Sequence, residues 1–465
     1  MLPTAHPLAV LFGDSFKAHA GKCVSCNRCK TFCAAFPRLY KIFEEADQSP
    51  LRPPFEKGGE GGIPEKQPPH PGSSPQGLEE KRSEIDRGLR EALALCSLCG
   101  QCELRCPASL DLAKHIMKAK IRYAENGLTR KERLMAGVDA VGRWGSRLAP
   151  VSNLLVNNPL VRLIAAPLTG IDPRRRLPGF ARPTFHDWAE TRRGEAPGSS
   201  HAPKGKVVYF AGCTANYFDP AIGQAAVAVL ERQGMEVVVP AHNCCGLPSI
   251  GIGDEKTARS LHEANLARLL PYVEEGRRIV CADCNCVHMM RNNAPFLWPT
   301  PETNRLAKAV TDLTSFLGEL VLQGRFDTAL GPVSGNIRYH YACHARTLRI
   351  GNETIDLLRR IPGLAIGYLD TLCCGMGGAF GMKEKTYDLS LEIGADLFKN
   401  VRHYRPDRIV TDAPLCGRQI QEAVGVQMLA PVQLLAEAYG IPATGQYSMV
   451  NGRSGQWSMT RAVNG

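Results

Sequence analysis

Cysteine dominates the chemistry that this chain can perform. The 465 residues contain 18 cysteines, which fall into four groups with none left over. Two N-terminal groups are Cys23, Cys26, Cys29 and Cys33, then Cys96, Cys99, Cys102 and Cys106. Two later groups are Cys213, Cys244, Cys245, Cys281, Cys284 and Cys286, then Cys343, Cys373, Cys374 and Cys416. Such clustering indicates metal sites, because structural thiols would be scattered, and the first residues lack the pattern of a secretory signal that would favour disulfides.

The two N-terminal groups share one spacing. Both "CVSCNRCKTFC" and "CSLCGQCELRCP" have the form C-x2-C-x2-C-x3-C, which is typical of proteins that hold two 4Fe–4S clusters and whose fourth cysteine crosses to the other cluster. The spacing therefore predicts one cluster on Cys23, Cys26, Cys29 and Cys106, and another on Cys96, Cys99, Cys102 and Cys33. Zinc is the alternative for any CxxC pair, but the doubled pattern favours iron. Pro107 follows Cys106 directly, whereas the proline after Cys33 is delayed to Pro37.

The later groups each contain adjacent cysteines before a glycine, in "HNCCGLP" and "TLCCGMG". Neighbouring thiolates can bind neighbouring irons of a cluster less regular than a cubane. Gly246 and Gly375 are expected to let the backbone pass close to that cluster, because glycine has no Cβ. A vicinal disulfide is the alternative, but it requires a strained ring and leaves the remaining cysteines without a role.

An internal repeat positions these cysteines. Cys213 and Cys343 are 130 residues apart, Cys244 and Cys373 are 129 apart, and Cys286 and Cys416 are 130 apart. Short apolar runs that read as buried strands end at cysteines in both copies, such as "KVVYFAGC" and "IRYHYAC", and helical stretches lie between them. This alternation predicts two α/β units with mostly parallel strands, in which loops at the strand ends converge on one crevice.

The chain resembles the D subunit of heterodisulfide reductase and its relatives, which include the glycolate oxidase iron–sulfur subunit and the C subunit of anaerobic glycerol-3-phosphate dehydrogenase. Besides the cysteines, the stretches "RLAPVSNLLVNNPLVRLI", "IDPRRRLPGF", "YFAGCTANYFDP", "IPGLAIGYLDTLCCG" and "APVQLLAEAYG" are similar to those of the last. The resemblance runs from about Cys23 to Gly440. It implies a helical two-cluster ferredoxin module followed by two α/β cysteine-rich (CCG) units, with one or two further iron–sulfur clusters at the CCG sites.

The family's usual closing motif is a CxxC, and this chain departs from it. Ala413 stands before Cys416 in the second copy, which leaves one thiol there. In the first copy Cys281 and Cys284 form a CxxC, but the repeat aligns Cys286 with Cys416. We therefore favour Cys286 as a ligand, with Cys281 or Cys284 as a fifth thiolate. The first site is expected to hold the unusual cluster, and the second a conventional or altered cluster, or none.

Composition and patterning set the frame around these sites. Hydrophobic residues make up 44% and charged residues 22% of the chain, as in ordinary globular proteins. The expected units are a ferredoxin module over residues 1–135 with a disordered proline- and glycine-rich insertion at 48–77, a linker that wraps the body over 136–204, CCG units over 205–330 and 331–445, and a disordered tail over 446–465. The formal charge of +11 is partly offset by anionic clusters, and no interleaved aromatic and basic stripe suggests nucleic acid.

Several weaker features have ordinary explanations. "GMGGAFG" misses the GxGxxG nucleotide fingerprint, so its glycines are expected to make room for a cluster. His242, His340 and His344 are expected to be hydrogen-bonding neighbours of the clusters rather than ligands. The arginines at 174–176 are expected to form a solvated face that could meet an acidic partner or lipid headgroups.

Three classes of function fit these patterns. The favoured one is a non-flavin electron-transfer subunit, which passes electrons from a flavoprotein dehydrogenase partner to a quinone or another acceptor. The second is a catalytic disulfide reductase at the CCG cluster, as the heterodisulfide reductase resemblance implies. The third, a structural or sensing iron–sulfur protein, is disfavoured because eight ferredoxin-spaced ligands exceed what a structural role needs. No uncharged run of 18 residues reads as a membrane span, so a cytoplasmic location is expected, with a peripheral position on the inner face of the cell membrane as an alternative.

Overall fold

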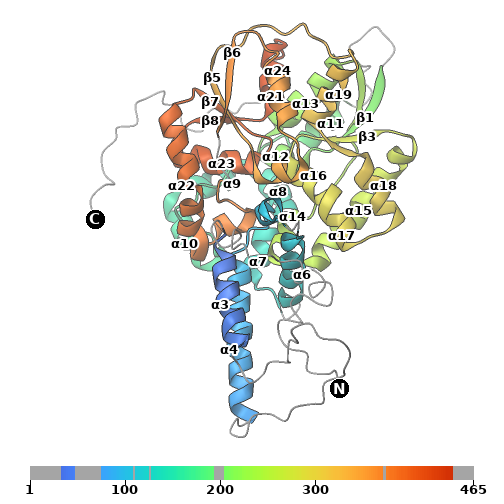
Figure 1. Ribbon diagram of the computed structural model, residues 1–465. Helices are drawn as coiled ribbons and strands as arrows, with labels where there is room; N and C mark the ends of the chain where they lie inside the picture. The colour runs from blue at the N-terminus through green and yellow to red at the C-terminus, as the bar shows by residue number, and fades with distance from the viewer. Residues whose placement is uncertain are drawn as a thin grey trace.

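A computed structural model describes residues 33–47, 75–107, 110–124, 127–192, 204–369 and 373–442. The first part of this chain is helical, and two α/β units follow it (Figure 1). The predictions for Cys23, Cys26 and Cys29, for most of the insertion and for the tail fall outside the described residues. Helix α4 begins at Pro75, within the last three residues of the predicted insertion.

The helical part contains two sets of helices. Before the linker lie α3 (Ala35–Asp47), α4 (Pro75–Ala94), α5 (Gln101–Arg105), α6 (Leu112–Ala124) and α7 (Arg130–Ala136). Within the linker lie α8 (Val138–Arg147), α9 (Ala149–Asn157), α10 (Pro159–Thr169) and α11 (Phe185–Thr191). Helices α3 and α4 pack side by side and project from the body (Figure 1). Their apolar positions Leu39, Ile85 and Leu89 are buried between them and the helices at their base.

The first α/β unit consists of β1 (Gly205–Tyr209), α12 (Gly212–Tyr217), α13 (Pro220–Arg232), β2 (Met235–Val238), α14 (Leu247–Ile252), α15 (Glu255–Glu274), β3 (Arg278–Cys281), α16 (Cys284–His288), the π-helical turn η1 (Met289–Asn293), α17 (Ala294–Leu297), α18 (Pro301–Ala309), β4 (Val310–Asp312) and α19 (Leu313–Leu322). Its strands pair in parallel in the order β2-β1-β3-β4. Helices connect successive strands, as parallel pairing requires.

The second unit consists of β5 (Gly335–His340), α20 (Cys343–Leu348), α21 (Asn352–Leu358), β6 (Leu364–Leu369), the 3-10 turns η2 (Gly378–Met382) and η3 (Glu384–Thr386), α22 (Tyr387–Tyr404), β7 (Arg408–Val410), α23 (Pro414–Val424), β8 (Gln427–Leu429) and α24 (Pro431–Ala438). The strand order is β6-β5-β7-β8, again all parallel. The two sheets therefore have the same topology, and the predicted pair of parallel α/β units is confirmed.

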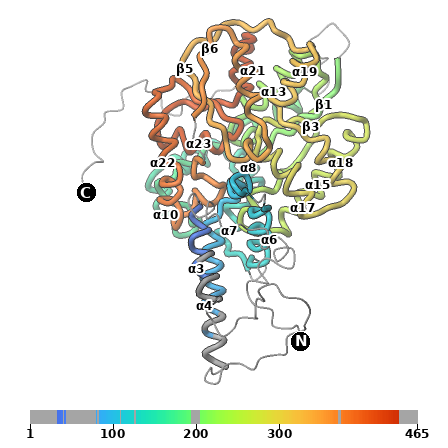
Figure 2. The backbone as a smooth tube through the Cα atoms, viewed as in Figure 1, coloured from blue at the N-terminus to red at the C-terminus, as the bar shows by residue number. Residues whose placement is uncertain are grey.

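A shared core joins the two units. Alternate residues of β1 face opposite sides of the first sheet. Val207 and Tyr209 pack in a first hydrophobic cluster, and Val208 packs in a second one. The first cluster also contains Ile337 and Tyr339 of β5, together with residues of α13, α19, α21 and α24. In Figure 2 the green and yellow first unit and the orange and red second unit accordingly lie side by side. The opposite face of the first sheet packs with α4 and α6, which fixes the helical part against it.

Arg175 attaches the linker to the second unit by a buried charge, which corrects the expectation for this one of the arginines at 174–176. Arg175 is 1% exposed; its guanidinium donates to Gly381 O, to Gln419 Oε1 at 2.6 Å and to Glu422 Oε2 at 3.0 Å. Arg174 pairs with Asp172 and with Asp388. Arg174 and Arg176 are exposed, so the expectation of a solvated face is wrong only for Arg175, which is held inside the protein.

Candidate functional site

The carboxyl ends of the first sheet's strands carry the first set of cysteines. Strand β1 leads into α12, which holds Cys213, and the loop after β2 holds Cys244 and Cys245. Strand β3 ends at Cys281, and Cys286 lies on α16, which follows it. Because the strands are parallel, these ends meet at one edge of the sheet, as predicted.

At this edge five sulfurs form one connected group, which we call the first sulfur group: Cys213, Cys244, Cys245, Cys281 and Cys286. Hydrogen bonds link the Cys213 thiol to Cys244, Cys244 to Cys245, Cys245 to Cys286, and Cys286 to Cys281. The Cys244 and Cys286 thiols lower the pKa of Cys245 to about 6, although its burial acts in the opposite direction. Its neighbours therefore favour the thiolate form of Cys245.

Cys284 lies apart from this group. It is fully buried, but it belongs to the core cluster of the second unit, and its N–H donates to Asp412 O at 2.9 Å. Cys286 instead faces inward, since a Cβ placed on Gly212 would lie 3.1 Å from its sulfur. The structure thus brings Cys281 and Cys286 to the other three sulfurs and leaves Cys284 apart. Of these, Cys286 is the residue that the repeat offset favours.

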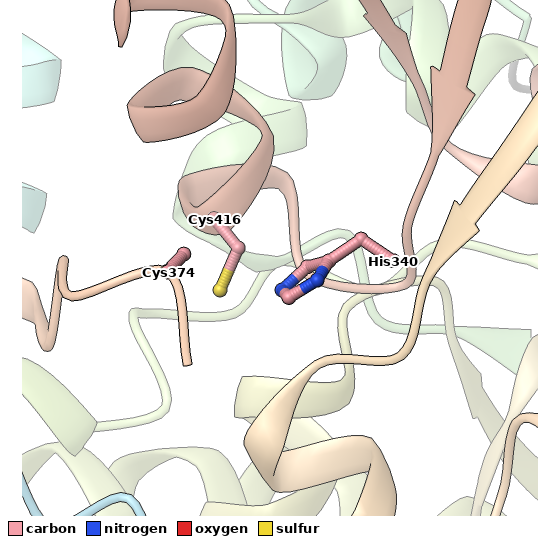
Figure 3. A group of neighbouring side chains, drawn as sticks. All are labelled: His340, Cys374 and Cys416. Atoms are coloured by element: carbon pink, nitrogen blue, oxygen red, sulfur yellow. The ribbon is translucent and has the colours of Figure 1, made fainter. Parts of the chain in front are cut away.

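The second sheet repeats the arrangement with four sulfurs, which we call the second sulfur group: Cys343, Cys373, Cys374 and Cys416. Hydrogen bonds link Cys343 to Cys373, Cys373 to Cys374, and Cys374 to Cys416. His340, the last residue of β5, lies beside them: its ligand nitrogen and the Cys374 and Cys416 sulfurs are all within 4.8 Å of one another (Figure 3). The Cys374 thiol, and then His340, lower the pKa of Cys416 to about 6.

The glycines after the paired cysteines have a structural role beside the one expected. Both adopt left-handed backbone, with φ of 90° at Gly246 and 84° at Gly375. A Cβ on Gly246 would lie 3.2 Å from Ala258 O of α15, and one on Gly375 would lie 1.8 Å from Ser390 O of α22. These glycines therefore allow a helix backbone to approach the turn, and room for a cluster beside them stays a prediction.

Cys33 lies with three cysteines of the second ferredoxin-type motif, and we call Cys33, Cys96, Cys99 and Cys102 the N-terminal sulfur group. Burial raises the pKa of both Cys99 and Cys102, and the charges of Cys96 and Cys33 raise both further. Cys33 is thus near these three, as the crossed ligation requires. Cys106 is partly buried after α5, and its predicted companions Cys23, Cys26 and Cys29 lie outside the described residues.

The N-terminal and second sulfur groups are neighbours. The charge of Cys373 acts on Cys99, and the charge of Cys99 acts on Cys343. His344 holds this junction together, because its Nε2 pairs with Leu98 O at 3.1 Å and its Nδ1 with Asn285 Oδ1 at 2.7 Å. Its ring also stacks on His288, with centroids 4.3 Å apart.

All three sulfur groups receive a hydrogen bond from a backbone N–H two residues along the chain. The distances are 3.4 Å from Leu98 to Cys96, 3.4 Å from Gly375 to Cys373 and 3.5 Å from Asp283 to Cys281. Hydrogen bonds of this kind stabilise negative charge on sulfur and tune the reduction potential of a cluster bound there.

The three predicted neighbouring histidines differ in their surroundings. His242 pairs with Pro240 O at 2.8 Å and accepts from Ala211 N–H at 3.1 Å, and His344 is bonded through both nitrogens as described above. Both are hydrogen-bonding neighbours, as expected. His340 is fully buried, and neither of its ring nitrogens has a nitrogen or oxygen partner in the described part of the chain; the Cys416 thiol is the polar group beside it.

The donor set suits iron–sulfur chemistry. Every described cysteine is a free thiol, so neither adjacent pair forms the vicinal disulfide considered above. Groups of four or five convergent sulfurs match the soft donors that iron–sulfur clusters use. Asp283 lies between the two CCG groups, since its charge acts on Cys213 and Cys286 and it feels the charge of Cys416.

A family model described as a cysteine-rich (CCG) domain matches the chain twice, over residues 207–291 and 337–421. These segments carry the two sulfur groups of the α/β units. The chain belongs to the CCG cysteine-rich domain family. The C subunit of the anaerobic glycerol-3-phosphate dehydrogenase of Escherichia coli K12 is 28% identical over 375 residues, which are 80% of this chain and 93% of that protein.

Two other proteins are also similar to this chain. The D subunit of the dihydromethanophenazine:CoB–CoM heterodisulfide reductase of Methanosarcina barkeri is 24% identical over 384 residues, 79% of this chain and 81% of that protein. Lactate utilization protein A of Bacillus pumilus is 31% identical over 183 residues, 38% of this chain and 75% of that protein. The resemblance inferred from the cysteine motifs is therefore confirmed. Two of these three relatives are named as subunits of a dehydrogenase or a reductase.

Proposed function

We propose that this chain is the iron–sulfur electron-transfer subunit of a dehydrogenase complex, similar in role to the C subunit of anaerobic glycerol-3-phosphate dehydrogenase. It passes electrons from a flavoprotein partner through 4Fe–4S clusters and the CCG sites toward a quinone or another acceptor. The observation that carries this proposal is the series of neighbouring sulfur groups, in which Cys99 interacts with Cys373.

The residues of this chain have distinct tasks in the proposed relay. Cys33, Cys96, Cys99 and Cys102 hold one cubane, and Cys106 joins Cys23, Cys26 and Cys29 at the other. The first sulfur group holds an irregular cluster with its five thiolates, and the second sulfur group holds another cluster. When bound, the clusters supply one-electron transfer. The surrounding protein excludes water from most of these sulfurs, since Cys245, Cys281, Cys286 and Cys374 are at most 5% exposed.

The position of the second sulfur group supports an order for the relay. It adjoins the N-terminal group through Cys99, and it adjoins the first group through Asp283. Electrons that enter at the N-terminal clusters therefore reach the second CCG site before the first. The names of relatives as subunits of larger enzymes support a separate partner that carries the flavin.

A disulfide reductase is the second candidate, and the similarity to the D subunit of heterodisulfide reductase favours it. In that case the first sulfur group is the place where a disulfide is cleaved in one-electron steps. The two functions differ in what reoxidises the reduced protein: a quinone for the relay, or a disulfide for the reductase.

Peripheral membrane association fits the surface of the linker. Large exposed apolar side chains gather on and between α8, α9 and α10: Trp144, Leu148, Val151, Leu154, Leu155, Leu160, Leu163, Ile164 and Leu168. The sequence between Asp139 and Asp172 contains no acidic residue, but it contains Arg143, Arg147 and Arg162. An apolar surface with tryptophan and arginine suits the interface of an anionic lipid bilayer. No helix in the described ranges is long and apolar enough to cross a membrane.

Vesicles of anionic phospholipid test the membrane part of the proposal. Ile164→Asp should lower cosedimentation of the full chain with these vesicles, because it places a charge in the apolar surface. Leu322→Asp is the matched control, since Leu322 is 90% exposed but lies on α19, outside that surface. Equal binding by both variants and the unmodified protein would contradict the assignment, and would favour a partner protein as the occupant.

Reoxidation of the anaerobically purified chain tests the electron-transfer function. After reduction with dithionite, we expect interacting EPR signals from two 4Fe–4S clusters and fast reoxidation by menadione, a soluble quinone. An iron content below about eight per chain contradicts the two-cubane assignment. Reoxidation by the CoM–CoB heterodisulfide with release of thiols, but not by menadione, would establish the disulfide reductase instead. A yellow protein that oxidises an organic substrate alone would remove the need for a flavoprotein partner.

A further inference from the structure

The two CCG units differ at two equivalent positions that lie side by side. An offset of 130 residues relates Phe210 to His340 and Cys281 to Thr411. Tyr209 pairs with Val280 in the first sheet, and Tyr339 pairs with Val410 in the second. The next residue on each strand therefore places Phe210 beside Cys281 and His340 beside Thr411. The first unit has an aromatic ring and a thiol there, and the second has an imidazole and a hydroxyl.

In the first unit, only the thiol of this pair meets the sulfur group. The Cys281 thiol is hydrogen-bonded to Cys286, which makes it the fifth sulfur. Phe210 stacks on His242, with ring centroids 4.2 Å apart, and contributes no donor atom. The fifth donor thus comes from the end of β3.

In the second unit, the equivalent of Cys281 cannot act as a donor in the same way. Thr411 is buried, and its hydroxyl accepts the N–H of Ala413 at 3.3 Å. Ala413, the position where the family's closing motif has a cysteine, has no donor atom. Four sulfurs therefore remain, and the end of β7 offers no fifth ligand.

His340 occupies the place from which a fifth donor can come. Its side chain is fully buried at the end of β5, the strand next to β7. Its polar neighbours are sulfurs, because one nitrogen lies within 4.8 Å of both Cys374 and Cys416, and neither nitrogen has a nitrogen or oxygen partner within the described ranges. Figure 3 shows its ring and the Cys416 side chain directed toward each other. A thiol is a weak hydrogen-bond partner, so a buried imidazole whose polar neighbours are thiols alone requires an explanation.

We propose that His340 binds iron at the second CCG site and supplies there the fifth donor that Cys281 supplies at the first. This inference rests on the proposed function, in that the second sulfur group must hold an iron–sulfur cluster. Imidazole is a good ligand for iron and replaces cysteine in some iron–sulfur centres. His340 is therefore a ligand, and not the hydrogen-bonding neighbour that its place in the sequence suggests.

The proposal predicts a difference in charge between the two sites. Five thiolates surround the first site, whereas four thiolates and a neutral imidazole surround the second. Fewer negative charges make reduction easier. The second site, which adjoins the N-terminal group, should therefore have a higher reduction potential than the first, if both hold the same kind of cluster.

Pulsed EPR of the anaerobically purified full chain tests the ligand directly. The protein is prepared with ordinary histidine and with 15N-histidine, and the cluster is observed in its paramagnetic state. A directly bound imidazole nitrogen gives a strong coupling that changes with the label, unlike the weak couplings of backbone amides. His340→Cys should abolish this coupling while the iron content is kept, because it supplies a thiolate in place of the imidazole. His242→Ala should leave the coupling unchanged.

Every outcome distinguishes the ligand proposal from the function on which it rests. If iron is present at the second site, as loss of iron in Cys374→Ser would show, but no labelled nitrogen couples, His340 is not a ligand and the relay stands. If the coupling persists in His340→Cys, another histidine is bound and this assignment is wrong. If Cys374→Ser changes neither iron nor spectra, or zinc occupies the site, both the ligand and the proposed cluster at that site fail. Because labelling uses the unmodified chain, a variant that does not fold cannot obscure the result.

Discussion

Gly377 lies where the N-terminal sulfur group meets the second CCG unit, and Gly377→Ala should separate them. A Cβ at this position would lie 2.4 Å from the Cβ of Ser97, which follows Cys96. The neighbouring Gly378 is a matched control: its φ is 61°, against 49° at Gly377, but a Cβ there meets nothing within 4 Å. Alanine thus has the same backbone strain at both positions, and a steric clash at only one.

The expected costs follow from these geometries. Left-handed backbone costs a residue with a side chain about 1–2 kcal/mol, so Gly378→Ala should lower stability by that amount. At Gly377 the Ser97 loop must also move by about 1 Å to restore an ordinary contact of 3.4 Å. Overpacking of this kind costs roughly 1–3 kcal/mol more, or is relieved by displacement of the loop. The excess of Gly377→Ala over Gly378→Ala measures the contact between the two sulfur-bearing segments.

Two measurements follow the loop and its cluster. Thermal unfolding of the anaerobic protein gives the difference in stability between the two variants. Freeze-quenched EPR after mixing with dithionite shows how fast the second site is reduced once the N-terminal clusters are reduced. We expect slower reduction of the second site in Gly377→Ala, because the displaced loop carries Cys96 and Cys99 away from Cys373. Equal stability and equal rates in both variants would refute the docking of Ser97 and the relay order that depends on it.

Two further predictions concern the linker and the first CCG site. Arg175→Met should destabilise the protein by about 3–5 kcal/mol in thermal or denaturant unfolding, because it leaves the mostly buried Glu422 without its partner. The control Arg360→Met, at an exposed position, should change the stability by no more than about 0.5 kcal/mol. Equal losses of stability in the two variants would contradict the buried ion pair. Cys286→Ser should lower the iron content and change the EPR spectrum of the first site, whereas Cys284→Ser should leave both unchanged. The reverse result would mean that the CxxC of Cys281 and Cys284 closes the first site.

The repeat in the sequence carried most of the information about the fold. Three cysteine offsets of 129 or 130 residues aligned the two copies, and the runs that end at these cysteines are the strands β1, β2, β3, β5, β6 and β7. The strands β4 and β8 were not predicted, because neither ends at a cysteine, which was the signal that marked the other strands, including the equally short β7. Position in the repeat also favoured Cys286, which faces the first sulfur group.

Other features depend on contacts that span long stretches of chain. Arg175 is buried only because Gly381, Gln419 and Glu422 meet it from more than 200 residues away. Likewise, nothing near Gly375 in the sequence indicates that α22 crosses behind it. The sequence contained a signal for His340, because the repeat aligns it with Phe210. This difference can be interpreted only with the strand register, which places Phe210 beside Cys281 and His340 beside Thr411.

The two CCG units show how a repeat can keep its backbone while its sites diverge. Strand order, parallel register and the positions of the paired cysteines are the same in both, because each is fixed by packing of the sheets and helices. The fifth donor is not fixed in this way, since either of two adjacent strand ends can deliver it. Its identity matters most at the second site, whose cluster is proposed to lie next to another anionic cluster. Like charges at short range oppose each added electron, so a neutral imidazole at His340 lowers the electrostatic cost of transfer from the N-terminal group.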